Sequence, residues 1–104
     1  MNNIVLMKCN NLINEIKESI SLYKEGIISD LFKEIVFNDS EKISFLIDEI
    51  NNYILPKLYY IKETIEKNKK IKKSKIDYGD YIIKNWPHES SLGLELIKFL
   101  KYID

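Results

Sequence analysis

The chain has 104 residues, enough for one hydrophobic core, and we expect residues 1–104 to form a single domain. It contains one histidine, one cysteine and no arginine, so the side chains that build most metal sites and nucleophile–base pairs are nearly absent. The formal charge is zero, but residues 1–50 carry five Lys and nine acidic residues, whereas residues 51–104 carry eleven Lys and seven acidic residues. This composition argues against an enzyme, and we expect no catalytic residue, no metal site and no cofactor.

Apolar runs in the chain are short. Lysine or an acidic residue interrupts each run well before the ~20 residues of a membrane span. The run from Ile4 to Met7 is also too short for the core of a signal peptide. We therefore expect a cytoplasmic protein without a membrane segment. Cys9 cannot form an internal disulfide and lies in an apolar segment, so we expect it in the core.

A stripe of apolar residues with helical spacing predicts a first helix from near residue 4 to Glu25. Its members are Leu12, Ile13, Ile16, Ile20, Tyr23 and Ile27. Gly26 suits the left-handed residue that closes a helix.

A second, shorter helix is predicted to follow and to stop near Asn38. Ser29 or Asp30 can accept hydrogen bonds from the free amides at its start. Its apolar positions are Ile28, Leu31, Phe32, Ile35 and Val36.

The longest apolar stripe predicts a third helix over about residues 40–68, with Asp39-Ser40 as its N-cap. The stripe consists of Ile43, Ile47, Ile50, Ile54, Leu58, Ile61 and Ile65. Pro56 lies inside it and should kink the helix, because proline lacks an amide donor and its ring crowds the carbonyl four residues earlier. The stripe keeps its phase across Pro56, which favours one kinked helix; a break at Asn51-Asn52 is the main alternative.

Six lysines among the nine residues Lys67 to Lys75 predict a loop, because like charges at this density repel one another along a helix. Tyr78 to Tyr81 is expected to form a turn, with Asp80 capping a short helical piece over Tyr81 to Asn85. Pro87 should end this piece.

Ser90 or Ser91 is the expected cap of the last helix. This helix carries Leu92, Leu96, Ile97, Leu100 and Ile103. The predicted fold is all-α: a single-domain antiparallel bundle of about four main helices with a long kinked third helix.

The polar segment Trp86 to Ser91 gathers His88, Glu89 and Ser90, but members of a catalytic triad are brought together by folding and are rarely consecutive. We interpret it as a polar loop before a helix. Asp48 and Glu49 are adjacent on a predicted helix and point in different directions, so they do not form a metal-ligand pair.

Nucleic-acid binding is the main alternative function. Residues 62–75 contain seven Lys and two Glu, and aromatic residues for base stacking lie near them in sequence. These aromatics are Tyr59, Tyr60, Tyr78, Tyr81 and Trp86. The zero net charge and the isoelectric point of about 6.6 favour a solvated basic loop instead, so nucleic acid is not the expected partner.

Protein binding is the preferred interpretation. Seven Tyr and one Trp are many for this length, and both side chains combine apolar area with a polar tip. Acidic residues of the first half are candidates for a negative face towards a basic partner. The predicted partner-binding residues are Tyr59, Tyr60, Tyr78, Tyr81, Trp86, Asp30, Glu34, Asp48 and Glu49.

In size, predicted fold and composition the chain resembles the small helical immunity proteins with which bacteria neutralise their own colicin-type or contact-dependent-inhibition toxins. Leu58-Tyr59-Tyr60 resembles the paired tyrosines with which colicin-nuclease immunity proteins engage their toxins. The acidic flank and the following proline of that motif are not present, so no site residue is carried over. The resemblance implies a specific inhibitor that binds one nuclease-like toxin, often beside its active site, through complementary charge and aromatic anchors.

The expected partner is thus a cognate toxin domain with a basic surface, and we expect a monomer or a weak homodimer. The alternative is a small nucleic-acid-associated or regulatory protein that uses the Lys67–Lys75 loop. A self-associating helical scaffold is a third hypothesis.

Overall fold

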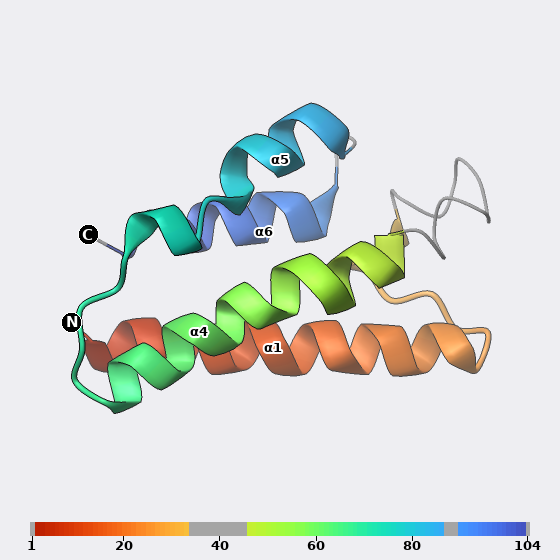
Figure 1. Cartoon of the computed structure of the whole chain (residues 1–104). Coiled ribbons are helices and arrows are strands. Elements are labelled where there is room, and N and C mark those ends of the chain that lie inside the picture. Colours follow the sequence, from red (N-terminus) through yellow and green to blue (C-terminus); the bar gives the residue numbers. More distant parts are fainter. Residues whose placement is uncertain (1, 34–45, 87–89, 104) are drawn as a thin grey trace.

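The computed structural model describes residues 2–33, 46–86 and 90–103. These residues contain four α-helices and no strand, so the prediction of an all-α fold is confirmed. The helices are α1 (Asn2–Lys24), α4 (Leu55–Glu66), α5 (Tyr78–Asn85) and α6 (Ser91–Leu100). Consecutive helices among them run in opposite directions, and both ends of the chain lie at the same end of the molecule (Figure 1).

Helix α1 ends at the predicted position. Gly26 adopts a left-handed φ of 84°. Its amide donates to the Tyr23 carbonyl at 3.0 Å, and the Ile27 amide donates to the Leu22 carbonyl at 2.8 Å. This pair of bonds satisfies carbonyls that the end of the helix would leave unpaired, and a glycine without Cβ allows it.

The segment after Gly26 differs from the predicted second helix. Residues 27–32 form a loop and a turn, and helical structure begins only at Lys33. The Ser29 hydroxyl donates to the Ser19 hydroxyl of α1 at 2.7 Å. Ser29 therefore ties this segment to α1, a role different from the predicted helix cap. Phe32 is buried and ties this turn to the core. The rest of the predicted helix lies outside the described residues.

The third predicted helix is continuous over its described part. Residues 46–49 are α-helical and lead through a π turn, η1 (Ile50–Ile54), directly into α4. In this widened turn the Leu55 amide donates to the Ile50 carbonyl, five residues earlier. The next residue, Pro56, has no amide hydrogen to donate. The alternative of a break at Asn51-Asn52 is wrong, because both residues lie within the π turn. The predicted start, near residue 40, lies outside the described residues.

Helix α4 ends at Glu66, where the lysine-rich segment was expected to end it. Asn68 takes a left-handed φ of 55°. The Asn68 amide donates to the Ile65 carbonyl at 3.0 Å, and the Lys69 amide donates to the Thr64 carbonyl at 2.9 Å. The helix therefore closes with the same two bonds as α1, using asparagine where α1 uses glycine.

Helix α5 starts at Tyr78, so the predicted turn over Tyr78 to Tyr81 and the capping role of Asp80 are wrong. Tyr78 is fully buried, and its hydroxyl donates to the Leu96 carbonyl of α6 at 2.8 Å. A Cβ on Gly79 would lie 3.3 Å from Leu100 Cδ1, which shows how closely α5 approaches α6 there. Burial of the Tyr78 ring draws the first turn of α5 onto the core.

The predicted cap of α6 is confirmed at Ser90, whose hydroxyl accepts from the Gly93 amide at 3.1 Å.

The hydrophobic core contains residues from all four helices. Ile50, Ile54, Leu58 and Ile61 are fully buried along the third helix. Cys9 is buried as expected, and its thiol donates to the Leu58 carbonyl at 3.2 Å.

None of the helices in the described ranges combines the length and the apolar character that a membrane crossing requires.

Candidate functional site

Glu49 joins two segments that are far from it in the sequence. Its carboxylate accepts a hydrogen bond from the Tyr81 hydroxyl of α5 and a second bond, at 3.3 Å, from the Trp86 indole nitrogen. Glu49 and Tyr81 are half-buried, while Trp86 lies in the core. The carboxylate therefore sits at the boundary between the core and the solvent, with both donors fixed by the fold.

Aromatic and cationic contacts extend this cluster along α4. The rings of Tyr53 and Tyr81 lie 4.8 Å apart with an angle of 41° between their planes. The Lys57 ammonium lies 4.6 Å from the centre of the Tyr53 ring and 3.4 Å from an Asp77 carboxylate oxygen. Lys57 thus connects the helix that carries Tyr53 to the residue just before α5.

A third tyrosine continues the row towards the lysine-rich loop. The Tyr60 hydroxyl accepts from the Lys72 amide at 3.0 Å, and the Lys75 ammonium lies 5.4 Å from its ring centre. Lys57 also donates to the Lys75 carbonyl at 3.5 Å. We call this connected surface row the tyrosine strip and define it as Glu49, Tyr53, Lys57, Tyr60 and Tyr81.

The spacing of residues explains the strip. Glu49, Tyr53, Lys57 and Tyr60 follow one another at intervals of four, four and three residues, so they share one face of the helix. Part of this face is built on the π turn, a local feature often found at functional sites. Tyr81 comes from α5 and contacts Glu49 and Tyr53 of this face.

Charge is distributed unevenly around the strip. The exposed acids Asp48 and Asp80 neighbour Glu49 and Tyr81 in the sequence, whereas the exposed Asp77 pairs with Lys57 in the middle of the strip. The other end meets the lysine-rich loop at Tyr60. The strip therefore runs from an acidic end to a basic end.

The hydroxyls of Tyr81 and Tyr60 ionise differently. Desolvation, together with the hydrogen bond to Glu49, raises the pKa of Tyr81 to about 12. The hydrogen bond from the Lys72 amide lowers the pKa of Tyr60, because this donor favours the phenolate. Tyr81 thus remains a hydrogen-bond donor well above neutral pH.

Of the nine predicted partner-binding residues, the structure brings Glu49, Tyr60 and Tyr81 together in the strip. Two predicted anchors are corrected. Tyr78 is 0% exposed and Trp86 is 5% exposed, so neither ring is presented to a partner. Each of them is buried because its polar tip finds a partner inside the fold, the Leu96 carbonyl for Tyr78 and the Glu49 carboxylate for Trp86.

The remaining predicted residues lie apart from the strip. Tyr59 is half-buried, with the Lys17 ammonium of α1 5.4 Å from its ring centre. Asp30 is exposed and pairs with Lys33 at 2.6 Å, and this hydrogen bond lowers its pKa. Asp48 is exposed beside Glu49. Glu34 lies outside the described residues.

Tyr53 and Lys57 were not among the predicted binding residues. Their spacing from Tyr60 is a helical signal that was available in the sequence. The contact of Tyr53 with Tyr81 could not be read from the sequence, because it depends on how α5 docks against the third helix.

The lysine-rich loop is held against α4. Ile76 is buried, Ile71 packs on the core, and the Tyr60 hydroxyl binds the Lys72 amide. The loop therefore has a defined path, with its lysines exposed. Tyr78 and Trp86 are buried in the core, so their rings are not available for the base stacking that the nucleic-acid alternative requires beside this loop.

Within residues 2–33, 46–86 and 90–103, His, Cys, Asp and Glu side chains do not gather in a group of three or more suited to a metal ion. Comparison of the chain with protein-family models, curated proteins and solved structures found no match.

Proposed function

We propose that this chain is a non-catalytic protein-binding module, an immunity protein that binds and neutralises a cognate nuclease-like bacterial toxin. The observation that carries the proposal is the tyrosine strip. Its three tyrosines and its carboxylate come from two separate helical segments and form one connected surface row.

The rings of the strip suit an interface because they are already fixed. Tyr81 is bound to Glu49 and lies against Tyr53, which in turn lies under Lys57. Ordering a side chain on binding costs about 0.5–1.5 kcal/mol, and a ring that is held beforehand avoids much of this loss. Tyrosine is also enriched among residues whose truncation weakens binding most.

The charges beside the strip favour a basic partner at one end. Asp48 and Asp80 are exposed and adjacent in sequence to Glu49 and Tyr81, and they can attract a cationic surface during the encounter. A toxin nuclease must bind polyanionic nucleic acid and therefore carries a basic surface. Covering such a surface would block its substrate.

A second candidate function is nucleic-acid binding by the Lys67–Lys75 loop. The observation that favours it is the defined path of this loop, which holds exposed lysines beside Tyr60. It is second because stacking on Tyr78 and Trp86 is not available.

The cellular test is co-expression with a candidate toxin domain, sought first at the C-terminus of any large secreted protein that an adjacent gene encodes. Wild-type chain should restore growth of bacteria that express this domain. Tyr53→Ala with Tyr81→Ala should abolish protection, whereas Tyr102→Ala, at an exposed tyrosine away from the strip, should preserve it. Equal protection by both variants, or none by the wild type, would contradict the proposal.

A further inference from the structure

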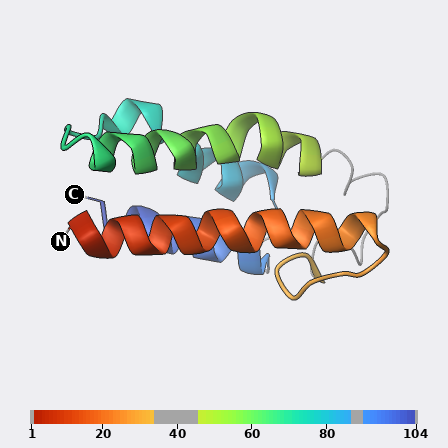
Figure 2. The same cartoon turned by 90° about the horizontal axis from the view of Figure 1, so that it is seen from below.

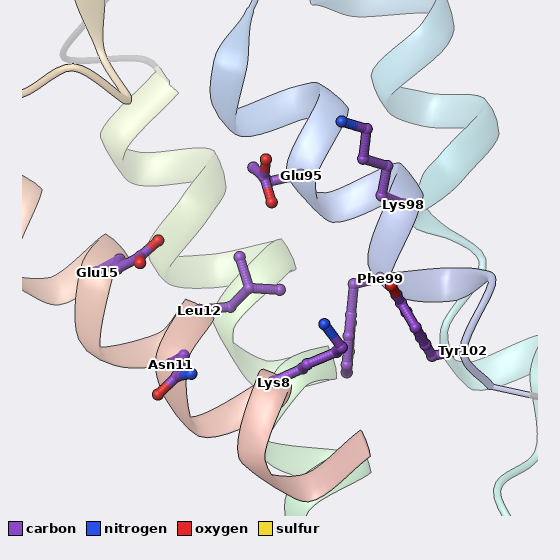
Figure 3. A pocket seen from close by; sticks show the side chains of 8 residues that line it. All are labelled: Lys8, Asn11, Leu12, Glu15, Glu95, Lys98, Phe99 and Tyr102. Atoms are coloured by element: carbon purple, nitrogen blue, oxygen red, sulfur yellow. The ribbon is translucent and has the colours of Figure 1, made fainter. Parts of the chain in front are cut away.

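Helices α1 and α6 form an open pocket of about 230 Å³ (Figure 3). Each helix contributes residues at positions i, i+3, i+4 and i+7, so the pocket follows one face of each. From α1 these are Lys8, Asn11, Leu12 and Glu15, and from the α6 side Glu95, Lys98, Phe99 and Tyr102. The two helices run antiparallel (Figure 1).

Charges in this pocket are separated along its length. Because α1 and α6 are antiparallel, Glu15 and Glu95 lie at the same end, as Figure 3 shows. Lys8 lies at the other end, with its ammonium 4.4 Å from the ring centre of Tyr102. Lys98 follows Glu95 by one helical turn, and Figure 3 shows its ammonium on the Glu95 side of the pocket, pointing away from Lys8. Both carboxylates of the pocket therefore lie at one end, and Lys8 lies at the other.

Apolar groups continue the surface beyond the basic end. Ile4 and Met7 precede Lys8 on α1 and are 50% and 55% exposed. Tyr102, against which Lys8 lies, is 52% exposed. Leu12 and Phe99, both buried, form the apolar floor. We name the whole surface the α1–α6 face, defined by the pocket residues with Ile4 and Met7.

We infer that the α1–α6 face pairs with the same face of a second copy of this chain about a two-fold axis. Such an axis across the pocket sets the Lys8 end of one copy against the Glu15 and Glu95 end of the other, twice over. A partner of one charge sign would meet repulsion at one end, whereas a second copy matches both ends. Ile4 and Met7 would be covered in the same contact.

The pairing is independent of the proposed function. The tyrosine strip lies on residues 49–60 and on α5, which form the upper layer in Figure 2, with α1 and α6 in the layer below. A dimer formed through the α1–α6 face therefore leaves the strip accessible.

The test is sedimentation velocity of the purified chain over a wide range of concentrations, with charge-reversal variants. Wild type should dimerise, and Lys8→Glu and Glu15→Lys should each weaken the dimer about tenfold or more by creating like-charge contacts. A mixture of the two variants should form a heterodimer as tight as the wild-type dimer, because the reversed charge of each copy then faces an opposite charge on the other. Lys84→Glu, the same charge change on α5, should have no effect.

Circular dichroism of each variant would establish that it is folded. A wild-type chain that stays monomeric at all concentrations would overturn the inference. A dimer insensitive to both reversals would place the contact on another face. If the mixed variants do not form a heterodimer as tight as the wild-type dimer, the pairing of Lys8 with the acidic end is ruled out. None of these outcomes bears on toxin binding by the strip.

Discussion

The indole nitrogen of Trp86 donates to the carboxylate of Glu49 across 3.3 Å, although the two residues are 37 positions apart in the sequence. Tyr81 donates to the same carboxylate oxygen. One acidic side chain thus holds both the middle and the end of the α5 segment against the third helix. The tyrosine strip depends on this docking, because Tyr81 reaches Tyr53 only when α5 is in place.

Glu49→Ala should lower the free energy of unfolding by about 1–3 kcal/mol, because it leaves the donors of Tyr81 and buried Trp86 without their acceptor. Asp48→Ala, at the exposed neighbouring position, should change it by less than about 0.5 kcal/mol. Urea unfolding followed by circular dichroism measures both. Equal effects of the two substitutions would mean that Glu49 does not hold α5.

Ile50→Ala and Ile54→Ala should each lower the free energy of unfolding by about 2–5 kcal/mol, since both side chains are fully buried at the π turn. Ile83→Ala is the matched control, because Ile83 is exposed on α5. Chemical denaturation of the three variants provides the measurement. A loss below about 0.5 kcal/mol at both buried positions would show that another face of this helix points to the core.

Stability should decline in alkaline solution. Burial raises the pKa of Cys9 from 9.0 to about 11, and partial burial raises that of Tyr81 from 10.0 to about 12. Burial also raises the pKa of Tyr78. Because the folded state holds these protons more tightly, their stabilising contribution is complete below the ordinary pKa values and is lost as the pH rises through the folded ones. The lowered pKa of Tyr60 acts in the opposite direction.

Denaturant unfolding at a series of pH values from 7 to 12 would record this loss. Cys9→Ala should reduce the decline that begins near pH 9, and Tyr81→Phe should reduce the later part. Tyr102→Phe, at an exposed tyrosine, is the matched control. A stability that stays constant to pH 12 would contradict the burial of these groups.

Helix ends that depend on one residue were predictable from the sequence. Gly26 closes α1, and Ser90 caps α6 through the Gly93 amide three residues later, because the physical cause of each lies within one turn. The continuity of the third helix followed from its apolar stripe. Its π turn was not predicted, since proline signals only that the regular pattern must change.

Positions that depend on distant contacts were not predictable. Tyr78 and Trp86 combine an apolar ring with a polar tip, so a sequence pattern allows either a surface or a core position. The choice is made by the Leu96 carbonyl, 18 residues away, and by Glu49, 37 residues away. The contact between Tyr53 and Tyr81 was not predicted for the same reason, because it forms only through the docking of α5.

The Lys67–Lys75 loop should bind nucleic acid only weakly and without sequence preference at physiological salt. Its lysines can contact phosphates, and each contact releases counterions, so affinity should fall steeply as salt rises. Fluorescence anisotropy with labelled single-stranded DNA and RNA at several salt concentrations provides the measurement. Sub-micromolar affinity at physiological salt, abolished by neutralising Lys69, Lys70 and Lys72, would instead favour the nucleic-acid function.

The most direct test of the tyrosine strip is the binding kinetics of the chain with the candidate toxin domain of the co-expression test. Tyr53→Ala and Tyr81→Ala should each weaken binding by about 2 kcal/mol or more, mainly through faster dissociation, because anchors act after the encounter. Asp48→Asn and Asp80→Asn should slow association, less so as salt rises. Tyr102→Ala should bind as the wild type does, and circular dichroism should confirm that every variant is folded. A tight complex whose dissociation is unchanged by both strip variants, or no complex at all, would contradict a toxin-binding role for the strip.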